Sequence, residues 1–273
     1  MPTTRELLDL RYGSAHDLPA RDALNPVLET ILTHRSVRAF LPDALEPGTL
    51  ELLIAAAQSA PSSSNLQLWS VVAVEDRERK ERVAKLVGNQ QHVREAPLFL
   101  AFLADTSRLA EVAAQQSIPS DGLPYLDTFL MGAIDAALAA QTAVIAAESL
   151  GLGTVYIGAL RNQPEQVAAE LGLRPGVSPI FGLVVGKPDP ARPTAIKPRL
   201  PQRAVAFREQ YASHDLGREV ARYDEVMRAF YAAQKLDQPS WSKHASERVR
   251  SPERLNGRHR LREALAALGF PLL

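Results

Sequence analysis

The chain has 273 residues, with 31 basic and 31 acidic side chains and no cysteine. Because the charges balance, no overall field attracts nucleic acid or a membrane surface, and neither is expected as a partner. A chain without cysteine has no disulfides, no thiolate nucleophile and no cysteine-ligated zinc or iron–sulfur centre. At this length one large core can form, with or without appendages.

Residues 1–27 are expected to form an N-terminal extension, interpreted as a surface arm or a partly ordered segment, because Gly13, Pro19 and Pro26 interrupt a segment of mixed composition. Charged residues beginning with Arg5 break up any hydrophobic stretch near the start. A secretory signal is therefore not predicted, and the expected location is cytoplasmic.

Alternating apolar elements follow along the first half of the chain. Apolar residues at helical spacing predict helices, whereas the run Trp-Ser-Val-Val-Ala-Val is typical of a strand. The helices are expected near 28–32, 47–57 and 76–87, and the strands at 69–74 and 98–103.

The longest predicted element is an alanine-rich helix over 126–150, ended by Gly151 and Gly153. Its Asp135 would be costly inside a bilayer, so a buried helix of a soluble protein is expected. Strands at 154–157 and 179–185, a helix at 163–171, and two helices at 216–235 and 258–268 in a helical tail (212–273) complete the series. This order of strands and helices indicates a layered α/β or α+β domain.

Three polar segments adjoin these elements: Thr-His-Arg-Ser-Val-Arg at 33–38, Ala-Pro-Ser-Ser-Ser-Asn-Leu-Gln at 60–67, and Ile-Lys-Pro-Arg-Leu-Pro at 196–201. Their Arg and Lys side chains suit a phosphate group, because a guanidinium matches two phosphate oxygens and an ammonium adds a point charge. Each segment alone is equally compatible with a solvated helix end or a capping loop.

Together with Gly88-Asn-Gln90 and the run from Ala146 to Asn162, these segments resemble the FMN-dependent nitroreductase and flavin reductase superfamily, in its group A, NADPH-type branch. The resemblance extends from about Leu28 to the C-terminus, and it implies one FMN-binding domain over 28–273. The implied fold is α+β, with a central mixed, mostly antiparallel sheet flanked by helices. The resemblance also implies a homodimer with two FMN sites at the subunit interface, with the 126–150 helix as candidate interface.

The residues that match the family's FMN-contacting segments fall in five groups. The first of these supplies contacts to the phosphate and the ring, the last supplies phosphate contacts, and the others supply contacts to the flavin. They are His34, Arg35, Ser36 and Arg38; Ser62, Ser63, Ser64, Asn65 and Gln67; Gln90; Tyr156, Ile157, Gly158, Ala159 and Leu160; and Lys197 with Arg199. Relatives more often carry an aromatic residue at Asn65 and a second glycine at Ala159. The flavin carries the redox chemistry in this family, so neither a catalytic side chain nor a metal is predicted.

The implied activity is a ping-pong reaction in which NADPH or NADH reduces FMN, and an electron-poor acceptor then takes two electrons. Nitroaromatics, quinones and free flavins are the expected acceptors. One alternative is a flavin-dependent dehydrogenase or dehalogenase with a dedicated substrate on the same fold. Another is a flavin-binding sensor without enzymatic activity.

The choice of nicotinamide depends on the stretch from Phe230 to Trp241. Group A members commonly carry two or more arginines here, which suit the 2′-phosphate of NADPH. This chain has Lys235 as its single basic residue and the acidic Asp237. A weak preference for NADPH is therefore expected, unless Arg218, Arg222 or Arg228 substitutes.

Overall fold

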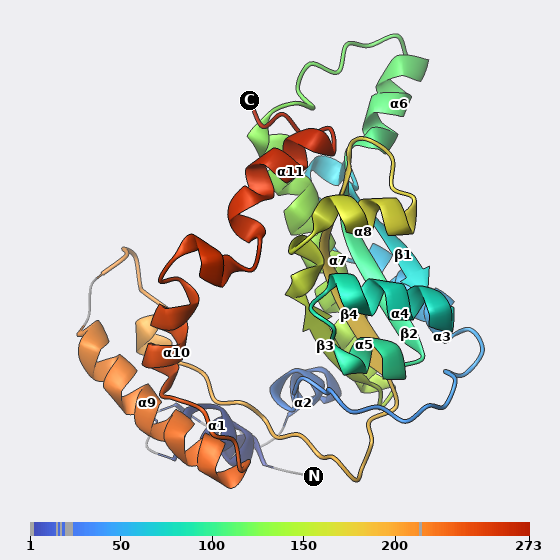
Figure 1. Ribbon diagram of the computed structural model, residues 1–273. Coiled ribbons are helices and arrows are strands. Elements are labelled where there is room, and N and C mark those ends of the chain that lie inside the picture. The colour runs from blue at the N-terminus through green and yellow to red at the C-terminus, as the bar shows by residue number, and fades with distance from the viewer. Residues whose placement is uncertain (1–2, 15, 17, 20–23, 213–214) are drawn as a thin grey trace. The chain divides into compact units, whose positions relative to one another are not determined.

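The computed structural model describes residues 3–14, 16, 18–19, 24–212 and 215–273, which divide into two compact units (Figure 1). The sheet unit comprises Ser36–Pro193 and Asn256–Leu273. The helical unit comprises the described residues up to Arg35 together with Thr194–Leu255.

The sheet unit is built on four strands in the order β1-β2-β4-β3. All three strand pairings are antiparallel, and among the described residues parallel pairing is limited to an isolated bridge between Ser36 and Thr154. Every strand pairing of this sheet is thus antiparallel, whereas a mixed sheet was predicted. Strands β2 and β3 run in the same direction, but β4 lies between them and pairs with both. The strands are β1 (Trp69–Val74), β2 (Leu98–Asp105), β3 (Gly153–Ile157) and β4 (Val177–Gly186).

Helices cover both faces of this sheet (Figure 1). On β2, Phe99, Ala101 and Leu103 belong to one core cluster, whereas the alternate residues Leu98 and Leu100 belong to the other. Because successive side chains of a strand point to opposite faces, a central strand covered on both sides is apolar throughout. The first cluster includes α4 (Arg77–Leu86), α5 (Gln91–Glu95) and α8 (Pro164–Leu171), and the second includes α3 (Thr49–Gln58) and α7 (Leu126–Ser149).

Helix α7 is long and apolar enough to cross a membrane by length and composition. In the structure, however, Ala136, Ala139 and Ala143 pack in the core beside the sheet, and Asp135 is 1% exposed. The small side chains allow close packing along this face. One face of helix α7 is therefore buried in the core of the sheet unit.

The remaining elements are shorter. The sheet unit also contains α6 (Ser107–Gln115), α11 (Leu261–Ala267) and the 3₁₀ turns η1 (Ser63–Asn65), η2 (Gly158–Arg161) and η5 (Arg258–Arg260). The helical unit contains α1 (Thr4–Tyr12), α2 (Pro26–Leu32), α9 (Leu216–Ala233), α10 (Trp241–Arg248), η3 (Gln202–Ala204) and η4 (Pro252–Leu255). Helices α5, α6 and α10 are too short or too polar to have been predicted from apolar spacing.

The interpretation of the N-terminal segment as a surface arm is wrong for Thr4–Tyr12, which form helix α1. Thr3 and Glu6 make a reciprocal capping box at its start, and Leu7 is only 1% exposed. A single buried apolar residue in a short charged helix gives too weak a periodicity to be recognised. Part of the predicted extension, residues 1–2, 15, 17 and 20–23, lies outside the described residues, and the boundary at residue 27 stays a prediction.

Candidate functional site

The serine-rich loop predicted to contact FMN is held by one buried carboxylate, that of Asp135 on α7. Its Oδ2 accepts hydrogen bonds from the Ser62 hydroxyl (2.7 Å) and the Leu68 N–H (3.2 Å), and its Oδ1 accepts one from the Ser63 N–H (3.0 Å). The Ser62 Oγ in turn accepts the Gln67 N–H at 2.8 Å. A carboxylate in the core needs such donors, because an unsatisfied buried charge is costly. Asp135 therefore fixes both ends of the loop.

The backbone of this loop is unusual in three places. Ser64, Asn65 and Gln67 have φ angles of 48°, 55° and 52°, in the left-handed region that non-glycine residues rarely adopt. Each such residue costs on the order of 1–3 kcal/mol and persists only where its surroundings enforce it. Clustered strain of this kind is a feature of ligand-binding segments.

Two further residues, Gly132 and Arg108, contact the loop and stabilise its position. A Cβ on Gly132, one turn before Asp135 on α7, would lie 2.9 Å from the Leu68 carbonyl oxygen, so only glycine allows this approach. On the other side, the Arg108 guanidinium donates to the Gln67 carbonyl at 2.8 Å and to the Ser70 hydroxyl at 2.6 Å. The loop residues Ser62, Asn65 and Gln67, with Arg108, line a polar pocket of about 690 Å³.

These bonds separate the predicted loop contacts into two kinds. The Ser62 hydroxyl has already donated its only proton to Asp135, so it serves to position the loop. Among the described residues the Ser64 hydroxyl has no hydrogen-bond partner, which leaves it available to a ligand.

The segment Ser36–Arg38 lies alongside strand β3. The Val37 N–H donates to the Thr154 carbonyl at 2.9 Å, and a Cβ on Gly153 would lie 2.7 Å from the Val37 side chain. Val37 is buried, whereas Arg38 is exposed and Ser36 is partly exposed. The close approach to β3 therefore presents Ser36 and Arg38 on either side of a buried anchor.

At the end of β3, the predicted contacts of residues 156–160 must be made largely by the backbone. The side chains of Ile157 and Leu160 are buried in the sheet's core cluster, and Ala159 packs against it. The start of η2 has no side-chain cap, and the first N–H groups of a helical turn have no partner within the turn. Burial raises the pKa of Tyr156, whose hydroxyl donates to Gln141 Oε1 at 3.3 Å.

Two arginines near Gly158 were not predicted as site residues. A Cβ on Gly158 would lie 3.7 Å from a terminal nitrogen of Arg161 and 3.9 Å from both terminal nitrogens of Arg258. Arg258 Nε also donates to Asn162 Oδ1 at 2.8 Å. The basic run Arg258-His-Arg260 was the only sequence signal, and nothing local connects it with a turn a hundred residues earlier.

The Gln90 amide donates to the Val87 carbonyl at 2.7 Å, so its NH₂ group is engaged within its own turn. The next residue but one, His92, has a buried Nε2 without a hydrogen-bond partner among the described residues. Burial and the neighbouring charge of Arg38 lower the pKa of His92, which is therefore neutral at pH 7. The contact of Gln90 with a ring stays a prediction.

In the helical unit, Arg11 joins the two segments that were predicted to bind a phosphate. Its guanidinium donates to the Lys197 carbonyl at 2.9 Å and to the His34 carbonyl at 3.2 Å. Lys197 and Arg199 are exposed on either side of the buried Pro198, whose carbonyl accepts the Tyr223 hydroxyl at 2.9 Å. The structure thus brings His34 and the Lys197–Arg199 pair together.

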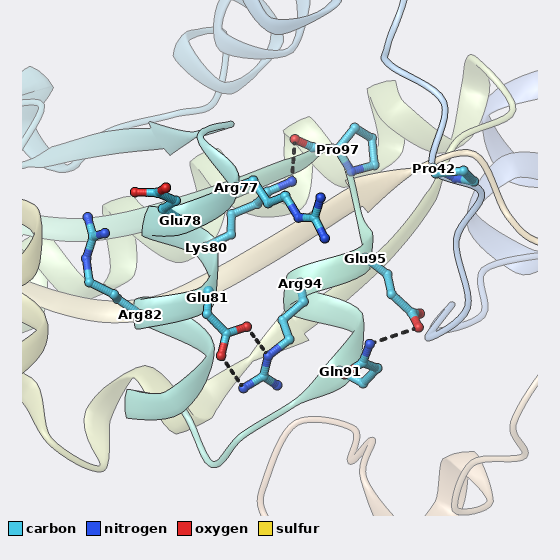
Figure 2. Close-up of a pocket in the computed structure, with 10 residues that line it drawn as sticks. All are labelled: Pro42, Arg77, Glu78, Lys80, Glu81, Arg82, Gln91, Arg94, Glu95 and Pro97. Atoms are coloured by element: carbon cyan, nitrogen blue, oxygen red, sulfur yellow. Dashed lines mark hydrogen bonds and ion pairs between the residues drawn. The ribbon is translucent and has the colours of Figure 1, made fainter.

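A cavity of about 1010 Å³ in the sheet unit is lined by residues of α4 and α5 (Figure 2). Its lining is charged, and its groups pair with one another, as Arg94 does with Glu81 at 2.5 Å. Lys80 donates to the Ala96 and Pro97 carbonyls. None of the predicted site residues lines this cavity.

The predicted residues fit FMN on three observations. Among the described residues no carboxylate forms an ion pair with Arg35 or Arg199, so both charges are available to a phosphate. The Ser64 hydroxyl and the buried His92 Nε2 have hydrogen-bonding capacity that the chain leaves unused. The strained loop at Ser64–Gln67 is held rigidly enough to present its groups to a ligand.

Comparison with known proteins identifies the family. Residues 31–187 match the model of the Nitroreductase family, and residues 197–273 match that of the Nitroreductase family C-terminal domain. The chain belongs to the nitroreductase family.

Three relatives illustrate the similarity. The chain is 39% identical over 252 residues to a Bacillus subtilis protein named as an FMN reductase with NAD(P)H, covering 90% of this chain and 98% of the relative. It is 38% identical over 223 residues to the oxygen-insensitive NADPH nitroreductase of Salmonella typhimurium, covering 81% and 90%. The structure of the NADPH:FMN oxidoreductase from Vibrio harveyi complexed with NAD⁺ superposes with a TM-score of 0.79 at 35% identity, covering 90% and 98%.

Replacing Asp135 tests its hold on the loop. In Asp135→Asn an amide NH₂ must face donors from Ser62, Ser63 or Leu68, and a lost buried acceptor costs about 1–3 kcal/mol. We expect the free energy of unfolding, measured by urea denaturation, to fall by that amount. Asp127→Asn, at an exposed position on the same helix, is the matched control and should change it by less than about 0.5 kcal/mol. Equal losses in both variants would contradict this role.

Proposed function

We propose that this protein is an FMN-dependent oxidoreductase that takes electrons from NAD(P)H and reduces nitroaromatics, free flavins or quinones by a ping-pong mechanism. The observation that carries the proposal is that the Arg11 guanidinium bonds the carbonyls of both His34 and Lys197. This holds the two predicted phosphate-binding segments next to each other. It is supported by relatives named as FMN reductase, NADPH-flavin oxidoreductase and NADPH nitroreductase. The expected location is the cytoplasm.

The residues have distinct roles in this proposal. Arg35, Lys197 and Arg199 bind the phosphate, since charge-assisted bonds to phosphate oxygens are the strong ones. Ser63, Ser64, Asn65 and Gln67 present hydroxyl and amide groups from the loop that Asp135 holds. The turn at Gly158 offers backbone N–H groups, and glycine there permits a close approach of the ligand.

Bound FMN supplies the two-electron redox chemistry, whereas the protein supplies position and electrostatics. The guanidinium groups of Arg161 and Arg258 beside Gly158 give that turn a positive environment. Positive charge and N–H donors at this place favour a ligand that gains negative charge. No side chain needs to act as a nucleophile.

We also propose a homodimer, with α7 contributing to the interface. Four apolar side chains at intervals of four residues remain exposed on this helix: Leu126 (45%), Leu130 (45%), Ile134 (55%) and Leu138 (39%). The opposite face of α7 is in the core. An exposed apolar stripe of this extent is typical of an interface, and a second copy of the same stripe can cover it around a two-fold axis.

The activity is tested on the purified protein. We expect it to release FMN, not FAD, on denaturation, and its flavin absorbance to bleach on addition of NAD(P)H and recover when an acceptor such as a nitroaromatic is added. Bleaching without recovery by any acceptor would favour the sensor alternative. Recovery only with one dedicated substrate would favour a dehydrogenase or dehalogenase, and FAD or no flavin would refute the assignment.

The nicotinamide preference is tested by steady-state kinetics. Lys235 is the single basic residue between the end of α9 and the start of α10, and it is exposed. We expect kcat/KM for NADPH to exceed that for NADH by no more than about tenfold, equivalent to about 1.4 kcal/mol. A preference above about a hundredfold would show that another basic group binds the 2′-phosphate. The variants Lys235→Ala, Arg218→Ala and Arg222→Ala would then identify it.

The oligomeric state is measured by sedimentation velocity. We expect a species of twice the 29.8 kDa chain mass. Ile134→Glu places a charge in the centre of the apolar stripe and should shift the population toward monomer, because an unpaired charge in an interface is costly. Val112→Glu, at an exposed apolar position on α6, is the control. A monomeric wild-type protein, or a dimer unaffected by Ile134→Glu, would contradict the proposed interface.

A further inference from the structure

Arg11, in the last turn of α1, is a buried cation that connects three separate parts of the helical unit. It is 8% exposed. Its terminal nitrogens donate to the carbonyl oxygens of Lys197 (2.9 Å), Leu32 (3.0 Å) and His34 (3.2 Å). Its own carbonyl accepts the Arg199 N–H at 2.8 Å. One residue therefore ties α1 to the end of α2 and to both basic residues of the 197–199 loop.

The positive charge of Arg11 is not balanced by a nearby negative charge among the described residues. Among the described residues, no carboxylate forms an ion pair with Arg11, Arg35 or Arg199. The Arg199 N–H bonds the Arg11 carbonyl, so the two residues are adjacent, and burial together with the charge of Arg199 lowers the pKa of Arg11. The guanidinium stays protonated all the same, and burying a cation without a counter-charge is unfavourable. An anion bound beside these groups would relieve the repulsion.

Helix α1 is held firmly enough to act as a support. Its start is capped by Thr3 and Glu6, and Leu7 is buried. Just after its end, Gly13 has a φ of 78°, and a Cβ there would lie 3.0 Å from Val226 on α9. The family matches cover residues 31–187 and 197–273, so α1 lies outside both.

We propose that α1 is a brace of the phosphate site and that Arg11 is its positioning residue. It rests on the proposed function, in that the anion is taken to be the phosphate of FMN. Arg11 holds the carbonyls of His34 and Lys197, and thereby fixes where the following Arg35 and the exposed Lys197 and Arg199 side chains emerge. The charge of Arg11 also makes the electrostatic potential at the site more positive, which favours binding of a dianion. It need not touch the ligand.

A merely structural role would weaken the binding of every flavin, whereas a phosphate-positioning role weakens FMN alone. The experiment therefore titrates the full-length apoprotein with FMN and with riboflavin, which lacks the phosphate, and follows the quenching of flavin fluorescence. Arg11→Met removes the donors and the charge but keeps most of the side-chain volume. Arg11→Lys keeps the charge with a different donor geometry. Arg5→Met, at an exposed position on the same helix, is the control.

We expect Arg11→Met to raise the Kd for FMN about tenfold and that for riboflavin by less than about twofold. Arg11→Lys should fall between wild type and Arg11→Met, and Arg5→Met should match wild type. Arg199→Ala, at a residue of the phosphate site itself, should raise the Kd for FMN by about ten- to a hundredfold.

Equal losses of FMN and riboflavin affinity, or no loss of either, would overturn the proposal. If Arg11→Met does not fold, as judged by circular dichroism, the ratio of the two affinities in Arg11→Lys decides: an unchanged ratio overturns the brace. A wild-type protein that binds neither FMN nor riboflavin refutes the proposed function itself. A wild-type protein that binds FMN normally, with an unchanged ratio in the Arg11 variants, refutes only the role of α1.

Discussion

A carboxylate buried in the middle of an alanine-rich helix is the constraint on which the sheet unit's candidate site depends. Asp135 is 1% exposed, and its hydrogen bonds to Ser62, Ser63 and Leu68 connect the core helix with the polar loop. Because a buried carboxylate needs donors, the loop's N–H groups and its hydroxyl must turn toward α7. The same bonds hold Ser64 and Asn65 in strained conformations. Packing of the sheet thus determines the shape of a surface loop.

In the helical unit, the buried cation Arg11 has a role comparable to that of the buried carboxylate of Asp135, because each side chain fixes the backbone of a polar segment by hydrogen bonds. Arg11 is satisfied by backbone carbonyls of Lys197, Leu32 and His34, yet it has no acidic partner among the described residues. Carbonyl dipoles solvate a guanidinium without neutralising it. Basic side chains held near each other in this way form a local positive site in a chain whose total charge is zero. A net charge of zero for the whole chain is therefore compatible with a local cluster of positive charge.

Membership of the nitroreductase family accounts for the segments that sequence motifs identified, but not for every residue's part in them. Ser62 belongs to the matching loop, and its hydroxyl serves Asp135. Ile157 and Leu160 belong to the matching turn, and their side chains fill the core. Conversely, Arg258 lies beside Gly158 without belonging to any predicted segment. A motif locates a stretch of chain, whereas the role of each side chain depends on which neighbours have already engaged it.

The sequence by itself determined the elements whose side-chain pattern is local. Strand β1 lies at the predicted residues, and β2, β4 and α7 end within a few residues of theirs, because long apolar runs allow few alternatives. The motifs likewise identified the family. Only the tertiary structure decided that Thr4–Tyr12 is a packed helix, that the strands of the described sheet pair antiparallel, and that Arg11 reaches Lys197 across 186 positions of sequence. These features depend on contacts between segments that are far apart in the sequence. Local periodicity and propensity do not predict which of those segments will be in contact.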